Sequence, residues 1–181
     1  MSSRYEIRLS GAGGQGLILM GKVLAEAAAI YEDRNATQSQ SYGPEARGGA
    51  SKSEVIISDG EIDYPKATDL DLLFAFTQEA CDKYSSDIKD NALVIVDSEF
   101  VTNPPVGNYR VLSLPVHQLA RDSVGKTIIA NILALGVIVE ASGVVLASSA
   151  EAAVKARVPR GTEEMNLKAF RAGVEAVRAM D

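Results

Sequence analysis

A glycine-rich turn near the N-terminus separates a short apolar segment from a long alanine-rich one. In Tyr5–Ser10, Ile7 and Leu9 are two positions apart, the period of a strand, and Leu17–Ile30 has apolar residues at helical spacing. The turn between them, Gly11-Ala12-Gly13-Gly14-Gln15-Gly16, has the G-x-G-x-x-G pattern, in which backbone N–H groups at a helix N-terminus can face an anion. A strand, a glycine turn and a helix in this order begin a βαβ unit, so the sequence predicts an α/β fold.

A second glycine-rich segment, Gln40–Gly49, follows a predicted short strand at Asn35–Ser39. Residues 40–50 show no periodicity and contain Gly, Pro, Ser and Arg, so we predict a loop. We expect this loop and the first glycine turn to lie at the same edge of one sheet, where α/β proteins bind ligands. Its Arg47 could clamp an anion, since a guanidinium pairs bidentately with phosphate or carboxylate. The alternative is a solvated arginine, or one paired with Glu45.

The rest of the chain alternates strands and helices and then becomes helical. Predicted strands are Ser53–Ser58, Leu70–Phe76, Ala92–Val96 and Tyr109–Leu114. Thr77 is predicted to cap a helix, and Ser148 with Glu151 matches a capping box. Long helices are predicted at Thr127–Ala141 and Glu163–Met180, the second with Leu167, Phe170, Val174 and Val177 facing inward and Lys168, Arg171, Glu175 and Arg178 facing out. No repeat or linker divides residues 1–181, so we expect one domain.

Composition excludes several classes of function. The net charge is −6 and no long basic run occurs, which argues against binding to a nucleic-acid backbone. The apolar runs are shorter than a membrane span, and the N-terminus has no signal-peptide pattern, so we expect a cytoplasmic protein without membrane contact. The single cysteine, Cys81, excludes an intrachain disulfide and an iron–sulfur cluster held by this chain alone, which takes about four thiolates. With one histidine, His117, a zinc site is also not expected.

Other motifs have simpler interpretations. NAD binding would need an acidic residue at the end of the second strand, which reads Asn35–Ser39 without one. Ser123–Thr127 resembles the end of a P-loop, but Ala120 stands where the first glycine should be, and we interpret the segment as a helix start. Cys81 is interpreted as a buried structural thiol. His117 has no identifiable partner in the sequence, and we interpret it as structural rather than as a general base.

Both glycine segments together resemble one family, the gamma subunits of the 2-oxoacid:ferredoxin oxidoreductases. The resemblance rests on Gly11–Gly16 and on Gln38–Ser51, which reads Gln-Ser-Gln-Ser-Tyr-Gly-Pro-Glu-Ala-Arg-Gly-Gly-Ala-Ser. It extends to Ile57-Ser58-Asp59 and, more weakly, to the helix containing Asn131 and Gly136, and it covers nearly the whole chain. The form of the second segment is similar to 2-oxoglutarate members more than to pyruvate members.

The resemblance implies a doubly wound, mostly parallel, Rossmann-like three-layer domain over residues 1–181, with a helical C-terminal part. It implies an enzyme that decarboxylates a 2-oxoacid on thiamine diphosphate with Mg²⁺, passes electrons through 4Fe–4S clusters to ferredoxin, and releases an acyl-coenzyme A. Alpha and beta chains would hold the thiamine diphosphate, and beta or a separate delta chain the clusters, so this chain should be inactive alone. Isolated, it would expose partner surface and self-associate, for example as a homodimer.

The function of the two glycine segments stays open at this point. Our hypothesis is that they line the edge where the acyl-coenzyme A step occurs, which makes the following residues candidate cofactor-binding residues: Gly11, Gly13, Gly14, Gln15, Gly16, Tyr42, Gly43, Arg47, Gly48 and Gly49. No catalytic or metal-binding residue is expected. One alternative is a free-standing mononucleotide-binding module that uses the first turn for a phosphate. Another is a scaffold subunit whose loops bind no ligand.

Overall fold

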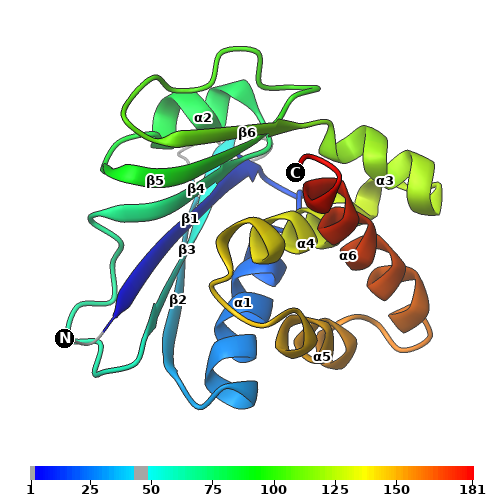
Figure 1. The fold of residues 1–181 in the computed structure, drawn as a ribbon, viewed down its shortest axis with the longest axis horizontal. Coiled ribbons are helices and arrows are strands. Elements are labelled where there is room, and N and C mark those ends of the chain that lie inside the picture. The colour runs from blue at the N-terminus through cyan, green and yellow to red at the C-terminus, as the bar shows by residue number, and fades with distance from the viewer. Residues whose placement is uncertain (1–2, 43–48) are drawn as a thin grey trace.

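The computed structural model describes residues 3–42 and 49–181, with the backbone alone described at Tyr42. A six-stranded sheet in the order β2-β3-β1-β4-β5-β6 lies between two helical layers (Figure 1). Its strands are β1 (Arg4–Ala12), β2 (Asn35–Tyr42), β3 (Ala50–Ser58), β4 (Leu70–Ala75), β5 (Ile88–Asp97) and β6 (Arg110–Leu114). The helices are α1 (Leu17–Tyr31), α2 (Gln78–Tyr84), α3 (Val116–Val124), α4 (Ala130–Ser142), α5 (Ala147–Arg157) and α6 (Glu163–Arg178), with a 3₁₀ turn η1 (Thr127–Ile129) before α4.

The sheet is mixed but mostly parallel, as predicted. Strands β1, β4, β5 and β6 are parallel neighbours, and β3 runs antiparallel to both β1 and β2. The predicted strand, glycine turn and helix are present as β1, the turn and α1, but β3 lies between β1 and β2. Because β2 and β3 pair antiparallel from Asn35 opposite Ser58 to Tyr42 opposite Ser51, the chain returns beside β1 before it crosses to β4.

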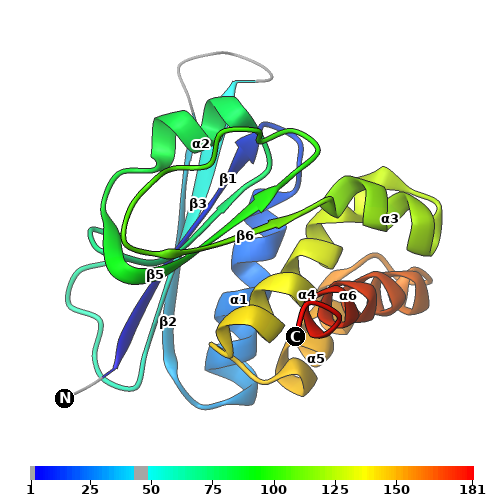
Figure 2. The same cartoon turned by 45° about the horizontal axis from the view of Figure 1, so that its top comes forward.

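A large apolar core fills the space between the sheet and the layer of α1 and α3–α6. Alternation along β1 directs Ile7 and Leu9 into this core, which confirms the prediction that they share a face. Helix α2 covers the other face over a smaller cluster that includes Leu73, Val94 and Cys81. The view turned by 45° separates α2 from the C-terminal helices (Figure 2). These observations confirm the predicted three-layer α/β fold.

Beneath α2, the sheet carries a buried ion pair that the sequence did not indicate. Arg8 Nε lies 2.8 Å from Glu54 Oε2, and both side chains are nearly inaccessible. A second guanidinium nitrogen of Arg8 donates to the carbonyl oxygens of Tyr84 and Ser86, at the end of α2. The pair therefore attaches the end of α2 to β1 and β3, and Arg8 satisfies the last carbonyl group of that helix, Tyr84, and that of Ser86 beyond it.

Helix α4 is enclosed by the protein, with every residue from Ala130 to Val139 buried. It packs closely on α6, because neither helix has a side chain where they cross. A Cβ built at Gly136 would lie 2.0 Å from the carbonyl oxygen of Phe170, and one at Gly173 would lie 2.1 Å from that of Leu133. Helix α6 has the predicted amphipathic pattern: the four apolar residues assigned to its inner face are buried and the four charged residues assigned to its outer face are exposed.

Several element boundaries differ from the predictions. Strand β2 continues through Tyr42, so the predicted loop is shorter, and residues 43–48 lie outside the described residues. Strand β5 begins at Ile88 instead of Ala92. Thr77 caps α2 as predicted, with its hydroxyl accepting from the Ala80 N–H at 3.2 Å. The prediction for Ser148 is wrong, because α5 begins at Ala147 after Leu146 and has no side-chain cap.

Among the described residues, no single helix is long and apolar enough to cross a membrane. Helix α3 and the segment Thr127–Ser142 reach that length and apolarity only when taken together, across a bend of 120°.

Candidate functional site

The carboxyl ends of the four parallel strands bring the candidate site residues to one edge of the sheet. The first glycine turn follows β1, Phe76 follows β4, Asp97 ends β5, and His117 lies just after β6. The second glycine segment reaches the same edge, since the Gly13 N–H donates to the Gly49 carbonyl oxygen at 3.1 Å. The predicted meeting of the two segments is therefore confirmed where both are described; Gly43, Arg47 and Gly48 lie outside the described residues, as does the Tyr42 side chain.

The first turn needs glycine for two different reasons. Gly14 and Gly16 have φ of 87° and 78°, the left-handed region that side chains disfavour. At Gly11 the reason is space, because a Cβ there would lie 2.5 Å from Gln15 Oε1. That oxygen accepts the Ala12 N–H at 2.7 Å, so the Gln15 side chain folds back and closes the turn.

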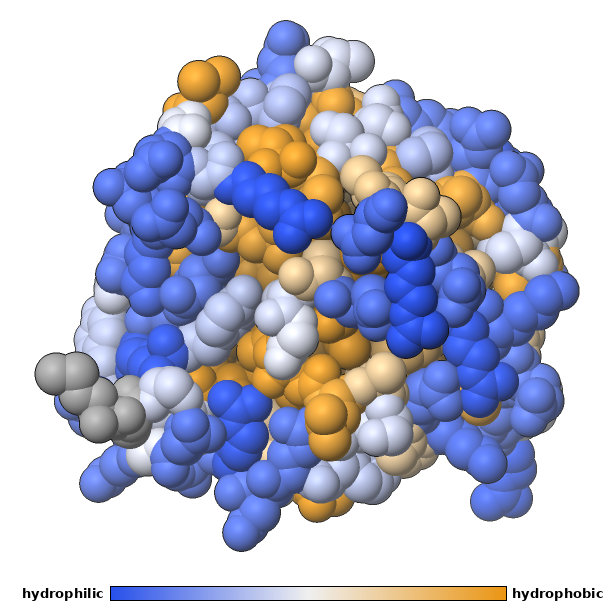
Figure 3. All heavy atoms as spheres, viewed as in Figure 1, coloured by the Kyte–Doolittle hydropathy of each residue, from blue (hydrophilic) through white to orange (hydrophobic). Residues whose placement is uncertain are grey.

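Two adjoining cavities open beside this turn and share Gly14, Gln15, Ile128 and Asn131. The smaller one, about 210 Å³, is completed by Phe76, His117, Thr127 and Ala130, and we call it the polar compartment. The larger one, about 440 Å³, is completed mainly by apolar residues of α1, η1, α4, α6 and the α5–α6 connection, and we call it the apolar compartment; they include Leu19, Ile132, Val158, Pro159 and Met165. On the face seen in Figure 3, hydrophobic residues gather where the sheet meets the helical layer.

Two helices begin beside these compartments. Helix α1 starts directly after Gly16 and has no acidic residue in its first turn. Helix α4 also lacks an acidic first turn, and its Asn131 side chain accepts the N–H of Ile132 at 2.9 Å. The partial positive charge of both N-termini is therefore not neutralised by carboxylates of these helices, which favours an anion in the space between them.

His117 has a partner that the sequence did not identify. Its Nδ1 lies 2.5 Å from Oδ2 of Asp97, whose side chain is fully buried. Phe76 and Phe100 pack against the imidazole in T-shaped arrangements, with ring centroids 5.3 and 5.0 Å away. The sequence does show that Asp97 is a carboxylate at the end of a buried strand. It does not show that Asp97 pairs with His117, because that contact requires β5 and β6 to lie side by side in the sheet.

Comparison with known proteins places this chain in a family. The family model "Pyruvate ferredoxin/flavodoxin oxidoreductase" matches residues 6–176. The chain belongs to the pyruvate ferredoxin/flavodoxin oxidoreductase family. It is 46% identical to the 2-oxoglutarate synthase subunit KorC of Methanocaldococcus jannaschii over 179 residues, which cover 98% of this chain and 96% of that protein.

Solved structures agree with this assignment. The gamma subunit of a keto/oxoacid ferredoxin oxidoreductase from Geobacter sulfurreducens PCA superposes with a TM-score of 0.90 at 55% identity, over 98% of both chains. The fold also occurs within a longer chain, the 2-oxoglutarate:ferredoxin oxidoreductase of Magnetococcus marinus, with a TM-score of 0.86 at 22% identity over 97% of this chain and 31% of that one. The predicted family and the gamma-type subunit role in an oxidoreductase complex are confirmed, and other subunits are this chain's partners.

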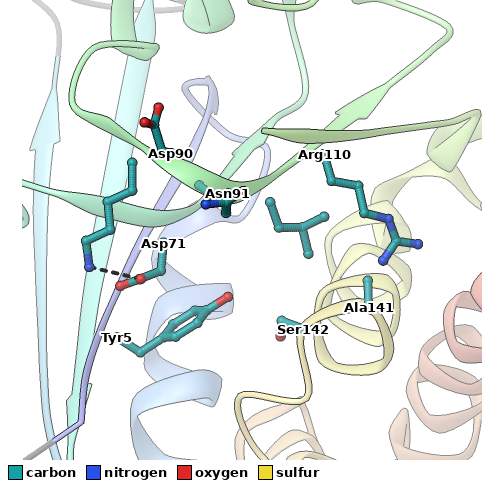
Figure 4. Close-up of a pocket in the computed structure, with 10 residues that line it drawn as sticks. Tyr5, Asp71, Asp90, Asn91, Arg110, Ala141 and Ser142 are labelled. Carbon is teal, nitrogen blue, oxygen red and sulfur yellow. Dashed lines mark hydrogen bonds and ion pairs between the residues drawn. The ribbon is translucent and has the colours of Figure 1, made fainter. Parts of the chain in front are cut away.

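A further cavity of the oxidoreductase subunit, about 250 Å³, lies at the opposite edge of the sheet, where the parallel strands begin (Figure 4). Tyr5 and Asp71 point into it, and Asp71 pairs with Lys89 at 2.9 Å. Burial, together with the charge of Asp71, raises the pKa of Tyr5 to about 12. Because α/β proteins bind ligands at the carboxyl ends of their strands, we assign the candidate site to the glycine-turn edge.

The P-loop-like segment of the subunit does not connect a strand to a helix. Gly125 ends α3 with φ of 74°, and its N–H donates to the Arg121 carbonyl oxygen at 2.9 Å. Thr127 then begins η1. The interpretation of this segment as a helix start is therefore confirmed for Thr127, whereas Gly125 belongs to the end of the preceding helix.

Proposed function

We propose that this chain is the gamma subunit of an enzyme that oxidatively decarboxylates 2-oxoglutarate, reduces ferredoxin and releases succinyl-coenzyme A. The supporting observation is the 46% identity to a 2-oxoglutarate synthase subunit over nearly all of both chains. In this proposal residues 1–181 act as one unit in the cytoplasm. Alpha and beta chains hold thiamine diphosphate and Mg²⁺, and beta or a delta chain holds the 4Fe–4S clusters and passes electrons to ferredoxin.

The donor set of this chain does not fit an iron–sulfur cluster. Such a cluster takes about four thiolates, and the only cysteine is Cys81. Cys81 is a residue of α2, and its thiol is buried between that helix and the sheet. This burial, and to a smaller extent the charge of Asp82, raises the pKa of the Cys81 thiol to about 11. No electron-transfer step is therefore assigned to this subunit.

The part of the reaction that this chain could serve is the binding of coenzyme A. Coenzyme A combines phosphoryl groups with a long uncharged arm, and the glycine-turn edge combines two helix N-termini with a polar and an apolar compartment. In this proposal Gly11, Gly13, Gly14, Gln15 and Gly16 approach the phosphoryl groups. The second segment contributes Tyr42, Gly43, Arg47, Gly48 and Gly49.

The test of the subunit role is co-purification of the tagged chain from its native host. The eluate is assayed for 2-oxoacid-dependent dye reduction with coenzyme A. We expect co-purifying chains with thiamine- and cluster-binding sequences, and highest activity with 2-oxoglutarate. A chain that elutes alone and inactive, but is stabilised by nucleotides in a thermal-shift assay, would instead support the free-standing mononucleotide module.

The test of coenzyme A binding is Arg47→Ala in the assembled enzyme. Loss of a guanidinium–phosphate contact should raise the KM for coenzyme A about tenfold, with the KM for 2-oxoglutarate unchanged. Arg110→Ala removes the same charge from an exposed position at the opposite edge of the sheet and is the matched control. If Arg47→Ala leaves both the KM for coenzyme A and assembly unchanged, Arg47 is not a contact.

A further inference from the structure

The Asp97 carboxylate has three hydrogen-bond donors, and they hold the His117 ring in one orientation. Oδ1 accepts the Glu99 N–H at 3.0 Å, and Oδ2 accepts the His117 N–H at 3.1 Å in addition to Nδ1. Nδ1 donates to the carboxylate, so Nε2 lies on the other side of the ring, and in the imidazolium form Nε2 carries a second N–H that can donate to an anion. The packed rings of Phe76 and Phe100 oppose rotation of the imidazole.

The imidazole is not needed to hold the start of α3 against the end of β5. The backbone N–H of His117 already donates to Asp97, and any residue except proline at this position would supply it. The His117 side chain is 15% exposed, and it lines the polar compartment. The ring side opposite the buried carboxylate therefore faces the space beside the glycine turn.

The polar compartment has the chemistry of an anion site. Its described lining offers the Thr127 hydroxyl, the Gln15 amide nitrogen and the imidazole as donors, and includes no carboxylate. Glu99, which is close to Asp97 in the sequence, is paired with Arg121 at 2.9 Å. At about 210 Å³ the compartment is suited to a compact group, whereas an uncharged arm is suited to the larger apolar compartment.

We propose that His117, as the imidazolium, donates a hydrogen bond from Nε2 to a phosphoryl oxygen of coenzyme A, with Asp97 as the positioning residue that orients the ring. This inference rests on the proposed binding of coenzyme A at the glycine-turn edge. It assigns the phosphoryl end of the ligand to the polar compartment and the uncharged arm to the apolar compartment.

The test uses the assembled enzyme with His117→Asn and His117→Gln. The asparagine amide nitrogen is bonded to Cγ, like Nδ1, so His117→Asn keeps a donor for Asp97 but has no atom in place of Nε2. We expect its KM for coenzyme A to rise about tenfold with kcat unchanged, the effect of losing one charged hydrogen bond made equally in ground and transition states. His117→Gln keeps a more distant donor and should lose less. An unchanged KM for coenzyme A in His117→Asn overturns the proposal.

Pantetheine, an acyl acceptor without phosphate, tests the chemistry of the contact. His117→Asn should leave the KM for pantetheine unchanged. An equal rise in the KM for both acceptors would overturn the assignment to a phosphoryl group. Asp97→Asn should raise the KM for coenzyme A in the native background but not in His117→Asn, and additive effects would show that Asp97 does not act through His117.

Ile128→Glu distinguishes failure of this inference from failure of the proposed coenzyme A site. Ile128 lines both compartments and is 85% exposed, so the substitution puts a carboxylate at their entrance with little effect on the core. If Ile128→Glu raises the KM for coenzyme A and His117→Asn does not, the ligand binds here without the imidazole. If neither substitution raises it, coenzyme A does not bind at this edge.

Discussion

At the scale of single residues, the glycine turn contains two positions that disfavour a side chain, and they do so for different reasons. Gly16 joins the glycine turn to α1, and a Cβ there would lie 2.3 Å from Nδ2 of Asn131. Gly14 has a similar left-handed backbone, but a Cβ there would have no atom within 4 Å. Substitutions at the two glycines therefore distinguish the energetic cost of a left-handed backbone from the additional cost of close packing.

We expect Gly14→Ala to lower the free energy of unfolding by about 1 kcal/mol, the cost of a left-handed alanine. Gly16→Ala should lower it by about 2–3 kcal/mol, because the buried Asn131 must also move. Urea denaturation of both variants measures the difference. Equal losses would show that Asn131 moves away at no cost.

Cys81 gives a second prediction at this scale. Its thiol is 1% exposed and its pKa is raised to about 11, so the reactive thiolate is scarce at pH 8. We expect iodoacetamide to modify the folded protein far more slowly than the urea-unfolded protein at that pH. Similar rates would mean that α2 opens readily from the sheet.

At the scale of elements, local signals predicted the type of most helices and strands but not all of their ends. Thr77 is a true cap, since its hydroxyl accepts the N–H of Ala80. Ser148 with Glu151 matches a capping box in the sequence, yet α5 has already begun at Ala147. A capping pattern specifies a helix start only when tertiary packing places the start at that residue.

These two positions form a matched pair of substitutions. Thr77→Ala should lower the free energy of unfolding by about 1 kcal/mol, the usual value of an N-cap. Ser148→Ala should change it by less than about 0.5 kcal/mol, because Ser148 is exposed inside a helix that favours alanine. Thermal or urea unfolding measures both, and an equal loss would contradict the assigned start of α5.

At the scale of the whole molecule, the closeness of α4 and α6 is set by two glycines. Alanine is favoured over glycine in a helix by about 1 kcal/mol, so the sequence alone would predict that Gly136→Ala stabilises the protein. The structure predicts the opposite, because the added Cβ would meet the carbonyl oxygen of Phe170, a backbone atom that cannot rotate away.

We therefore expect Gly136→Ala to lower the free energy of unfolding by about 1–3 kcal/mol, the cost of overpacking a close contact net of the gain in propensity. Gly143→Ala is the control, since a Cβ at that position has open space and only its left-handed φ opposes alanine. A gain in stability for Gly136→Ala would show that α4 and α6 can separate freely.

The sequence by itself determined what neighbouring residues decide: the strand and helix periods, the glycine turn, the amphipathic α6 and the family resemblance. The first three of these depend on interactions within a few residues along the chain, and the family resemblance depends on the motifs themselves. Only the tertiary structure decided that β3 lies between β1 and β2, that Arg8 is paired beneath α2, and that Asp97 holds His117. These arrangements join residues that are distant in the sequence, and their residue types alone do not specify which partners the folded chain brings together.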